Sequence, residues 1–228
     1  MAKKIGVLLS GNGVFDGSEI HESSFTLLAL AQKGAETVCL APDVDQHHVI
    51  NHTNGDEMDE KRNVLIESAR IARGEIEDVA KADLSQLDAL AIPGGFGTAK
   101  NHTKWAFSGP DGEILPEVKK AILHFVENKK PILGLCMGPT TIAKALEGSD
   151  VHAKLTVGTD KEKSPYDIAG ISQGMEKTGA AVEMKTIREV LTDKENKIVT
   201  APCYMMDASI TEVHDNVQDA VEELYRLF

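Results

Sequence analysis

Basic residues are scarce in this sequence. Its 228 residues include 24 lysines and arginines against 36 aspartates and glutamates, which gives a formal net charge of -12 at pH 7. Nucleic acids and anionic membranes are bound by clustered positive charge, so this balance argues against both kinds of partner. The composition favours chemistry on small molecules instead.

Long hydrophobic runs are also missing, since no apolar stretch reaches the roughly 18 residues that suggest a membrane-spanning helix. The first residues, Met1–Lys4, lead directly into an apolar segment without the pattern of a signal or transit peptide. The three cysteines, Cys39, Cys136 and Cys203, include no CxxC pair, which fits a reducing compartment better than a disulfide scaffold or a zinc site. We therefore expect a cytoplasmic protein.

Short apolar segments alternate with helical patterns along the chain, and no linker, repeat or low-complexity tract interrupts them. Strands are predicted at 4–9, 37–42, 87–92, 131–135 and 154–157, and helices at 20–33, 116–128, 139–146 and 207–228. This alternation predicts an α/β protein whose sheet is mostly parallel, with helices on both sides and active residues at the carboxyl ends of the strands. Residues 188–200 predict an antiparallel hairpin at the sheet edge.

One domain is expected over residues 1–228, because a chain of this length with 42% hydrophobic residues can bury a full core. Two segments do not fit a minimal core of this class and are interpreted as insertions. The first, 43–74, is polar and carries histidines, and the second, 96–115, contains glycine, histidine and Trp105. Both are candidates for lids or interfaces.

A nucleophile elbow is predicted around Cys136. The strand 131–135 stops at this cysteine, and Gly134 and Gly138 flank it two residues away on either side, so the turn can adopt angles that larger residues resist. The N–H groups at the start of the helix that follows would favour a thiolate. The alternative is a small buried hydrophobe at the end of a strand. The glycine frame favours a reactive thiol.

A second glycine-rich loop, Pro93–Gly97, follows the strand that ends at Ile92. Its consecutive glycines allow close backbone approach, so the N–H near Gly95 and the N–H of Met137 are candidates for an oxyanion hole. The alternative is a tight turn between strand and loop. No GxGxxG or GxxxxGK[ST] pattern occurs, so a nucleotide site is not expected.

Three loops resemble the signature loops of the ThiJ/PfpI superfamily, within the class I glutamine amidotransferase-like fold: Ser18–Glu19, Pro93–Gly97 and Gly134–Pro139. Longer segments are similar to the ElbB branch, also called enhancing-lycopene-biosynthesis or sigma cross-reacting protein: 11–22, 62–74 and 201–205. The similarity spans essentially the whole chain. The branch name links it to isoprenoid biosynthesis, for which these residues offer no mechanism.

The resemblance implies a flavodoxin-like three-layer sandwich. In it, Cys136 matches the nucleophile, Glu19 matches the conserved acid, and the backbones of Gly95 and Met137 match the oxyanion donors. It also implies a cofactor-independent glyoxalase of weak activity, with no metal or nicotinamide, that acts on a small reactive aldehyde. Members of the superfamily usually form homodimers.

A glyoxalase reaction at Cys136 requires a protonated acid beside the sulfur, because an ionised carboxylate there would raise the pKa of the thiol. Glu19 could equally be a first-turn acid that stabilises the dipole of the following helix, and Glu22 could serve in its place. A thiolate would add to the aldehyde of glyoxal or methylglyoxal to form a hemithioacetal, and the acid would then transfer a proton between adjacent carbons through an enediol.

His21, Glu22, Gly94 and His102 are further candidate pocket residues. Trp105 and Phe107 could cap that pocket or, equally, form an interface contact.

The sequence departs from two related chemistries. The late histidine, His214, lies in a predicted helix and has no glutamate two residues after it, which argues against a glutaminase. Met137 stands directly after the cysteine, where PfpI-type peptidases have a histidine, which argues against a peptidase.

Two alternatives stay open at this point. His48 and His52 are four residues apart and could share a helix face as metal ligands, but solvated loop histidines are the ordinary explanation, so no metal site is expected. The protein could also be a redox-responsive regulatory or binding protein, in which a Cys136 thiolate of low pKa is oxidised.

Overall fold

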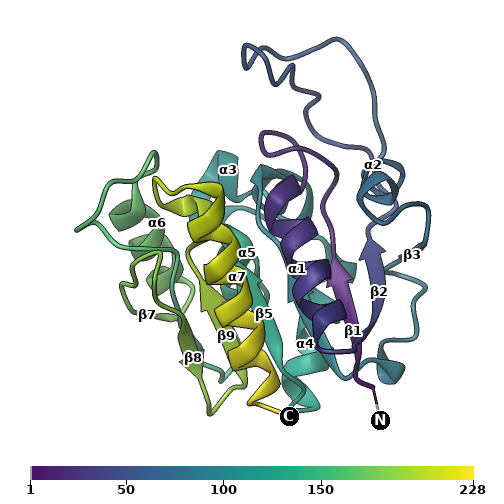
Figure 1. Cartoon of the computed structure of the whole chain (residues 1–228). Coiled ribbons are helices and arrows are strands. Elements are labelled where there is room, and N and C mark those ends of the chain that lie inside the picture. Colours follow the sequence, from purple (N-terminus) through teal and green to yellow (C-terminus); the bar gives the residue numbers. More distant parts are fainter. Residues whose placement is uncertain (1) are drawn as a thin grey trace.

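A mixed sheet of seven strands forms the centre of the computed structural model, which describes residues 2–228 (Figure 1). The strand order is β3-β2-β1-β4-β5-β9-β8, with all neighbours parallel except β8 and β9. The strands are β1 (Lys4–Leu8), β2 (Glu36–Ala41), β3 (Ile76–Asp78), β4 (Ala89–Ile92), β5 (Ile132–Leu135), β8 (Leu191–Asp193) and β9 (Ile198–Ala201). This arrangement confirms the predicted α/β fold.

Helices cover both faces of the sheet, with α1 and α7 on the face toward the viewer in Figure 1 and α4 and α5 behind it. The helices are α1 (Ile20–Gln32), α2 (Val64–Ile71), α3 (Trp105–Ser108), α4 (Pro116–Glu127), α5 (Gly138–Leu146), α6 (Ile168–Lys177) and α7 (Ile210–Tyr225). The central strands are apolar because both their faces are covered; Ile132, Leu133 and Leu135 of β5 are fully buried. Within residues 2–228, no helix is long and apolar enough to cross a membrane.

The predicted strand at 154–157 is not part of the central sheet. Its ordered part, β6 (Lys154–Leu155), pairs in parallel with β7 (Ala181–Val182) as a separate two-stranded sheet. The predicted hairpin at 188–200 is present, but only β8 lies at the edge, because β9 also pairs with β5. The prediction missed this because a local pattern does not say which strands pair.

The two predicted insertions have different structures. Residues 43–63 project from the carboxyl ends of the strands, at the end of the molecule opposite the chain termini (Figure 1), while α2 in the first insertion packs on β2 and β3. The second insertion, 96–115, is folded into short helical turns: η2 (Thr98–His102), α3 and η3 (Gly109–Asp111). Two further 3-10 turns are η1 (Leu84–Gln86) and η4 (Cys203–Met205). Both insertions therefore border the end of the sheet where the elbow lies.

Candidate functional site

Cys136 occupies a sharp turn between β5 and α5. Its backbone φ is 55°, in the left-handed region that non-glycine residues rarely adopt, so the surrounding structure must hold this strained conformation. The Cys136 N–H donates to the carbonyl oxygen of Ala201 (3.0 Å), which extends the β5–β9 pairing to the cysteine itself. A Cβ on Gly138 would lie 2.6 Å from the Ile92 carbonyl oxygen, so only glycine lets the helix start this close to β4. The Cys136 side chain is 5% exposed.

The carboxyl group that faces Cys136 belongs to Glu22, in the first turn of α1. Glu22 is fully buried, its Oε2 accepts a hydrogen bond from the Gly94 N–H (3.0 Å), and its Oε1 accepts one from the Tyr204 N–H (3.1 Å). A Cβ on Gly94 would lie 2.6 Å from Glu22 Oε2 and 2.8 Å from Cys136 Sγ. The carboxylate oxygen and the sulfur therefore lie close together beside the Cα of this glycine. Two loops, after β4 and after β9, thus fix the carboxyl group beside the sulfur.

Glu19, the predicted catalytic acid, has a different position. Its Oε2 accepts a hydrogen bond from the Glu22 N–H (2.7 Å), which makes Glu19 the N-cap of α1. Its own N–H donates to the carbonyl oxygen of Gly94 (2.9 Å). The structure therefore places Glu22, and not Glu19, beside the cysteine sulfur, while the carboxyl group of Glu19 caps the helix.

Burial controls the protonation of this pair. Desolvation, together with the nearby charge of Glu19, raises the pKa of the Glu22 carboxyl to about 8. Desolvation and the charge of Glu22 also raise the pKa of the Cys136 thiol, although the backbone N–H groups of Gly95 and Met137 point toward the sulfur and act in the opposite direction. At neutral pH the pair holds both protons, because each charged form is costly in a dry site. Burial thus opposes the low-pKa thiolate that the helix terminus was expected to favour.

The candidate pocket histidines lie outside the immediate site. His21 is exposed, and its Nδ1 is 2.9 Å from the hydroxyl oxygen of Tyr204. His102 is fully buried, its Nε2 is 2.9 Å from the Leu9 carbonyl oxygen, and desolvation lowers its pKa to about 4. His102 is thus a neutral structural residue beneath the carboxyl end of β1, which corrects its placement in the pocket.

A cavity of about 230 Å³ opens beside Cys136, and Gly95 and Met137 line it. Trp105 belongs to its lining as expected, whereas Phe107 packs 4.4 Å from the ring of His47 and does not. Two tyrosines that the sequence did not single out, Tyr166 and Tyr204, also line the cavity. Tyr204 lies in segment 201–205, so the resemblance to the ElbB branch was the available signal; Tyr166, in an irregular loop, had none.

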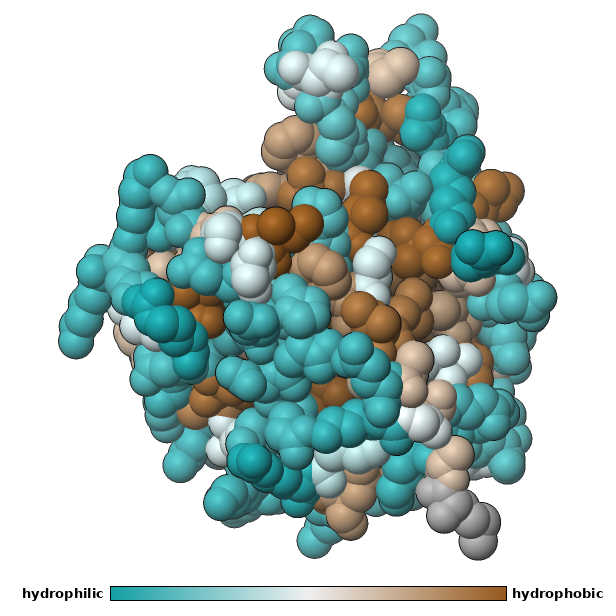
Figure 2. All heavy atoms as spheres, in the orientation of Figure 1, coloured by the Kyte–Doolittle hydropathy of each residue, from teal (hydrophilic) through white to brown (hydrophobic). Residues whose placement is uncertain are grey.

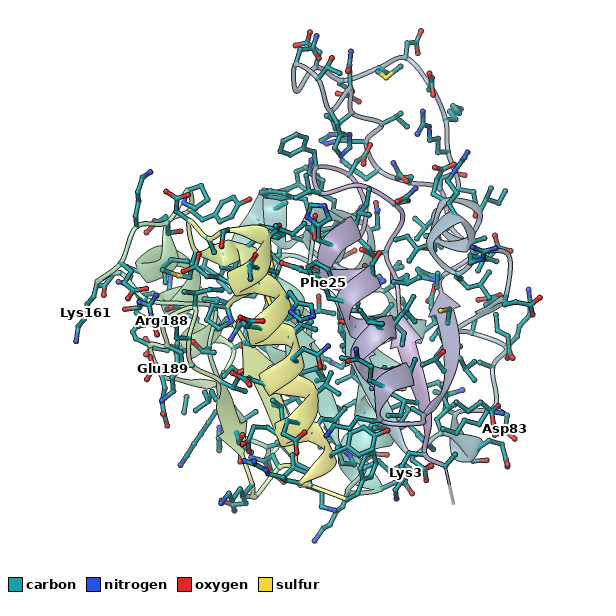
Figure 3. All side chains as sticks on the ribbon, viewed as in Figure 1. Lys3, Phe25, Asp83, Lys161, Arg188 and Glu189 are labelled. Atoms are coloured by element: carbon teal, nitrogen blue, oxygen red, sulfur yellow. The ribbon has the colours of Figure 1, made fainter. Side chains whose placement is uncertain are left out.

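The remaining histidines have other partners. His48 and His52 lie in the projecting segment 43–63, which forms no helix, so they do not share a helix face. In residues 2–228, no group of three or more His, Cys, Asp or Glu side chains is placed to hold a metal ion. The late histidine, His214, packs edge-on against Phe25 (5.2 Å between centroids), which Figure 3 shows between α1 and α7.

Adding one methyl group at Gly94 is expected to disrupt the site. The Cβ of Gly94→Ala would lie 2.3 Å from the Cys136 Cβ, which no rotamer change relieves, so we expect a loss of about 1–3 kcal/mol in the free energy of unfolding. Urea denaturation measures this loss. The same substitution in a Cys136→Gly background, which removes the clashing Cβ, should cost less; an equal cost in both backgrounds would contradict the contact.

Comparisons with known proteins agree with this architecture. Residues 58–216 match the family "Glutamine amidotransferase class-I". The human glutamine amidotransferase-like class 1 domain-containing protein 3, mitochondrial, is 41% identical over 99% of this chain and 84% of its own length. The crystal structure of an isoprenoid biosynthesis protein with an amidotransferase-like domain from Ehrlichia chaffeensis superimposes with a TM-score of 0.89 at 32% identity, covering 99% of both chains.

A more distant structure has the same fold. Glyoxalase III from Candida albicans superimposes with a TM-score of 0.61 at 16% identity, covering 97% of each chain.

The comparisons also correct the expected location. The human relative is named as a mitochondrial protein, and the similar rat and zebrafish proteins carry mitochondrial names as well. These names point to mitochondria and contradict the cytoplasmic expectation, which rested on the lack of a recognisable leader.

The matched residues, 58–216, include the elbow and most of the strands that position it. Because this family matches more than half of the chain, and because the human relative is 41% identical over 99% of the chain, the chain belongs to the class I glutamine amidotransferase family.

Proposed function

We propose that this protein is a cofactor-independent glyoxalase-type enzyme of the ElbB branch, which converts 2-oxoaldehydes such as glyoxal and methylglyoxal into 2-hydroxy acids at Cys136. One observation carries the proposal: the buried Glu22 carboxyl group, with a pKa of about 8, meets the Cys136 sulfur over Gly94 at the edge of a cavity. A nucleophile beside a carboxyl group whose pKa lies close to neutral pH suits carbonyl addition followed by proton transfer, because that group can both take up and release a proton.

The reaction begins when the pair has lost one proton, which comes from Glu22 because burial raises the pKa of the Cys136 thiol further; the Glu22 carboxylate then takes the thiol proton as the sulfur attacks. The Cys136 thiolate adds to the aldehyde carbon, a C–S bond forms, and Glu22 gives its proton to the carbonyl oxygen, which produces a hemithioacetal. The N–H groups of Gly95 and Met137 are the candidates to stabilise the developing oxyanion.

Glu22, now a carboxylate, removes the proton from the carbon that carries the sulfur and delivers it to the adjacent carbon through an enediol. The hydroxyl proton on the sulfur-bearing carbon passes to the oxygen of the adjacent carbon, so the first oxygen becomes the carbonyl of a thioester and the second becomes the hydroxyl of the product. Water cleaves the thioester to a 2-hydroxy acid and restores the cysteine. The sum is the addition of one water molecule, so no oxidant or reductant is consumed.

The fold shared with the Candida albicans glyoxalase III is compatible with this proposal. Glutaminase chemistry is less well supported, since no histidine lines the cavity in the described residues and His214 packs on Phe25. The redox-responsive alternative needs the same Cys136 thiolate, which burial disfavours at neutral pH, so carbonyl turnover is the measurement that separates the two functions.

The test is the formation of glycolate from glyoxal in the absence of glutathione, followed by chromatography of the product. The Cys136→Ala protein, prepared in the same way, is the reference for background conversion. Glycolate production above that reference supports the proposal, and equal production by both proteins overturns it.

The pH dependence follows from the protonation of the pair. Because the active form has lost one of two protons, kcat/KM for glyoxal should rise about tenfold per pH unit below about pH 8 and level off above it. Initial rates across this range, corrected for uncatalysed conversion, measure the profile. A profile that is flat through neutral pH would contradict the raised pKa of Glu22.

We also infer that the protein forms a homodimer, because members of the superfamily that it resembles usually do. Its proposed partner is a small aldehyde substrate, and neither nucleic acid nor a membrane is proposed as a partner. Light scattering coupled to size-exclusion chromatography distinguishes a dimer from the 24.6 kDa monomer.

A further inference from the structure

The cavity beside Cys136 is larger than glyoxal or methylglyoxal requires. Its volume of about 230 Å³ corresponds to roughly eight water molecules at their volume in the liquid. Glyoxal has only four heavy atoms and would leave more than half of this space unfilled. Unfilled apolar space contributes no binding energy, so a substrate of this size would use little of the site.

The lining of this cavity is apolar. None of its twelve lining residues, all within the described chain, carries a charge. Phe96, Trp105, Ile171 and Met205 contribute large apolar surfaces, and only tyrosine hydroxyls and the indole N–H add polar side-chain groups besides the thiol. A carboxylate or a glutathione conjugate would find no cation among these residues, whereas an aryl or branched alkyl group would contact apolar side chains.

A second cavity, of about 460 Å³, adjoins the first and is mostly apolar, with Lys100 as the one charged residue in its lining. It shares Phe96 and Tyr166 with the inner cavity, and the rings of these two residues meet edge-on with centroids 5.7 Å apart. Phe15, which is 38% exposed, and Ile50 line its outer part. Figure 2 shows hydrophobic residues gathered below the projecting segment on the face that it draws. An apolar substituent could therefore extend toward the surface.

We propose that the substrate of this site is a 2-oxoaldehyde whose ketone carbon carries an aryl or branched alkyl group that fills the inner cavity. The inference rests on the proposed function and names its substrate class. The reacting aldehyde lies against Cys136, whose sulfur lies beside Glu22, and the apolar group lies against Trp105 and Ile171. The chemical steps are those of the glyoxalase reaction, and the product is the corresponding 2-hydroxy acid.

The first test compares phenylglyoxal with methylglyoxal, after correction for their different equilibria with a free thiol. We expect kcat/KM to be at least about tenfold higher for phenylglyoxal, because one methylene in an apolar pocket already gives about 10-fold or more discrimination. Turnover of methylglyoxal with an equal or higher kcat/KM would overturn the substrate class while leaving the proposed function intact.

A substitution in the lining tests the location of the apolar group. Ala106 lines the inner cavity and is exposed, so Ala106→Phe can occupy the space without disturbing the core. It should lower the ratio of phenylglyoxal to methylglyoxal kcat/KM at least about tenfold. Ser108→Phe, on the same short helix α3 but outside the lining, is the matched control and should leave the ratio unchanged. Equal ratios in the two variants would overturn the placement.

Binding without turnover separates failure of the inference from failure of the function. Trp105 is the only tryptophan of the chain and lines the cavity, so its fluorescence reports on an occupant. In the Cys136→Ala protein, cyclohexyl methyl ketone should bind at least about tenfold more tightly than acetone. If no 2-oxoaldehyde is converted but this difference is seen, the glyoxalase proposal fails and the apolar ligand class is supported. Equal affinities would overturn the inference.

Discussion

Conversion of glyoxal should fall to the uncatalysed rate in Cys136→Ala, a loss of at least about 10³-fold in kcat/KM. Without the sulfur no hemithioacetal forms, and the proton transfer and thioester hydrolysis that follow have no intermediate to act on. The substitution keeps the Cβ and the N–H bonded to Ala201, so the strained turn is preserved. Glycolate formation, measured at about pH 8 where the pair is active, gives the comparison.

The matched control is Cys39→Ala, which also removes one buried sulfur. Cys39 lies on β2, separated from β5 by β1 and β4, and burial raises the pKa of its thiol to about 11. This variant should lose some stability but keep its kcat/KM. Residual glycolate formation by Cys136→Ala, or an equal loss in Cys39→Ala, would show that the chemistry does not run through Cys136.

Replacing Glu22 with glutamine should lower kcat/KM by about 10²–10⁴-fold, the usual contribution of a positioned acid or base. Glutamine keeps the size of the side chain but cannot take up or release the proton. Its amide group also offers one acceptor oxygen where Glu22 accepts from both the Gly94 and the Tyr204 N–H groups, so one of these donors loses its partner. Circular dichroism and thermal unfolding must establish that the variant is folded before its rate is interpreted.

Glu19→Gln is the control that separates the two acids. The amide oxygen of glutamine can still accept the hydrogen bond from the Glu22 N–H and cap α1, so kcat/KM should stay within about threefold of the unchanged protein. The negative charge of Glu19 is one cause of the raised pKa of Glu22, so its removal should also move the pH profile toward lower pH. A larger loss in Glu19→Gln than in Glu22→Gln would return the acid's role to Glu19.

Patterns that act over a few residues were predicted correctly. The apolar runs at β1 and β5, the stop at Cys136 and the glycines around it mark strands, a tight turn and a helix start, because backbone angles and hydrophobic periodicity are local properties. The resemblance of three loops to a known superfamily supplied the order of these motifs along the chain. The local patterns and the resemblance together indicated the α/β class and predicted that the two glycine-rich loops lie at one end of the sheet.

Contacts between distant residues decided the rest. Glu19 and Glu22 both lie at the start of α1, and nothing local indicates which of them reaches the sulfur. The choice depends on Gly94 and Tyr204, which are 72 and 182 residues from Glu22 along the chain. The pairing of β6 with β7 was hidden for the same reason.

The sequence by itself determined the fold class, the elbow and the cysteine at its apex, because a buried parallel strand and a glycine-framed turn leave a direct pattern in the residues. Only the tertiary structure placed Glu22, and not Glu19, beside the sulfur, raised the pKa of both Cys136 and Glu22, and lined the cavity beside the cysteine with apolar side chains. All three depend on contacts between distant segments, because the loops after β4 and β9 hold the Glu22 carboxyl group and exclude water from the start of α1.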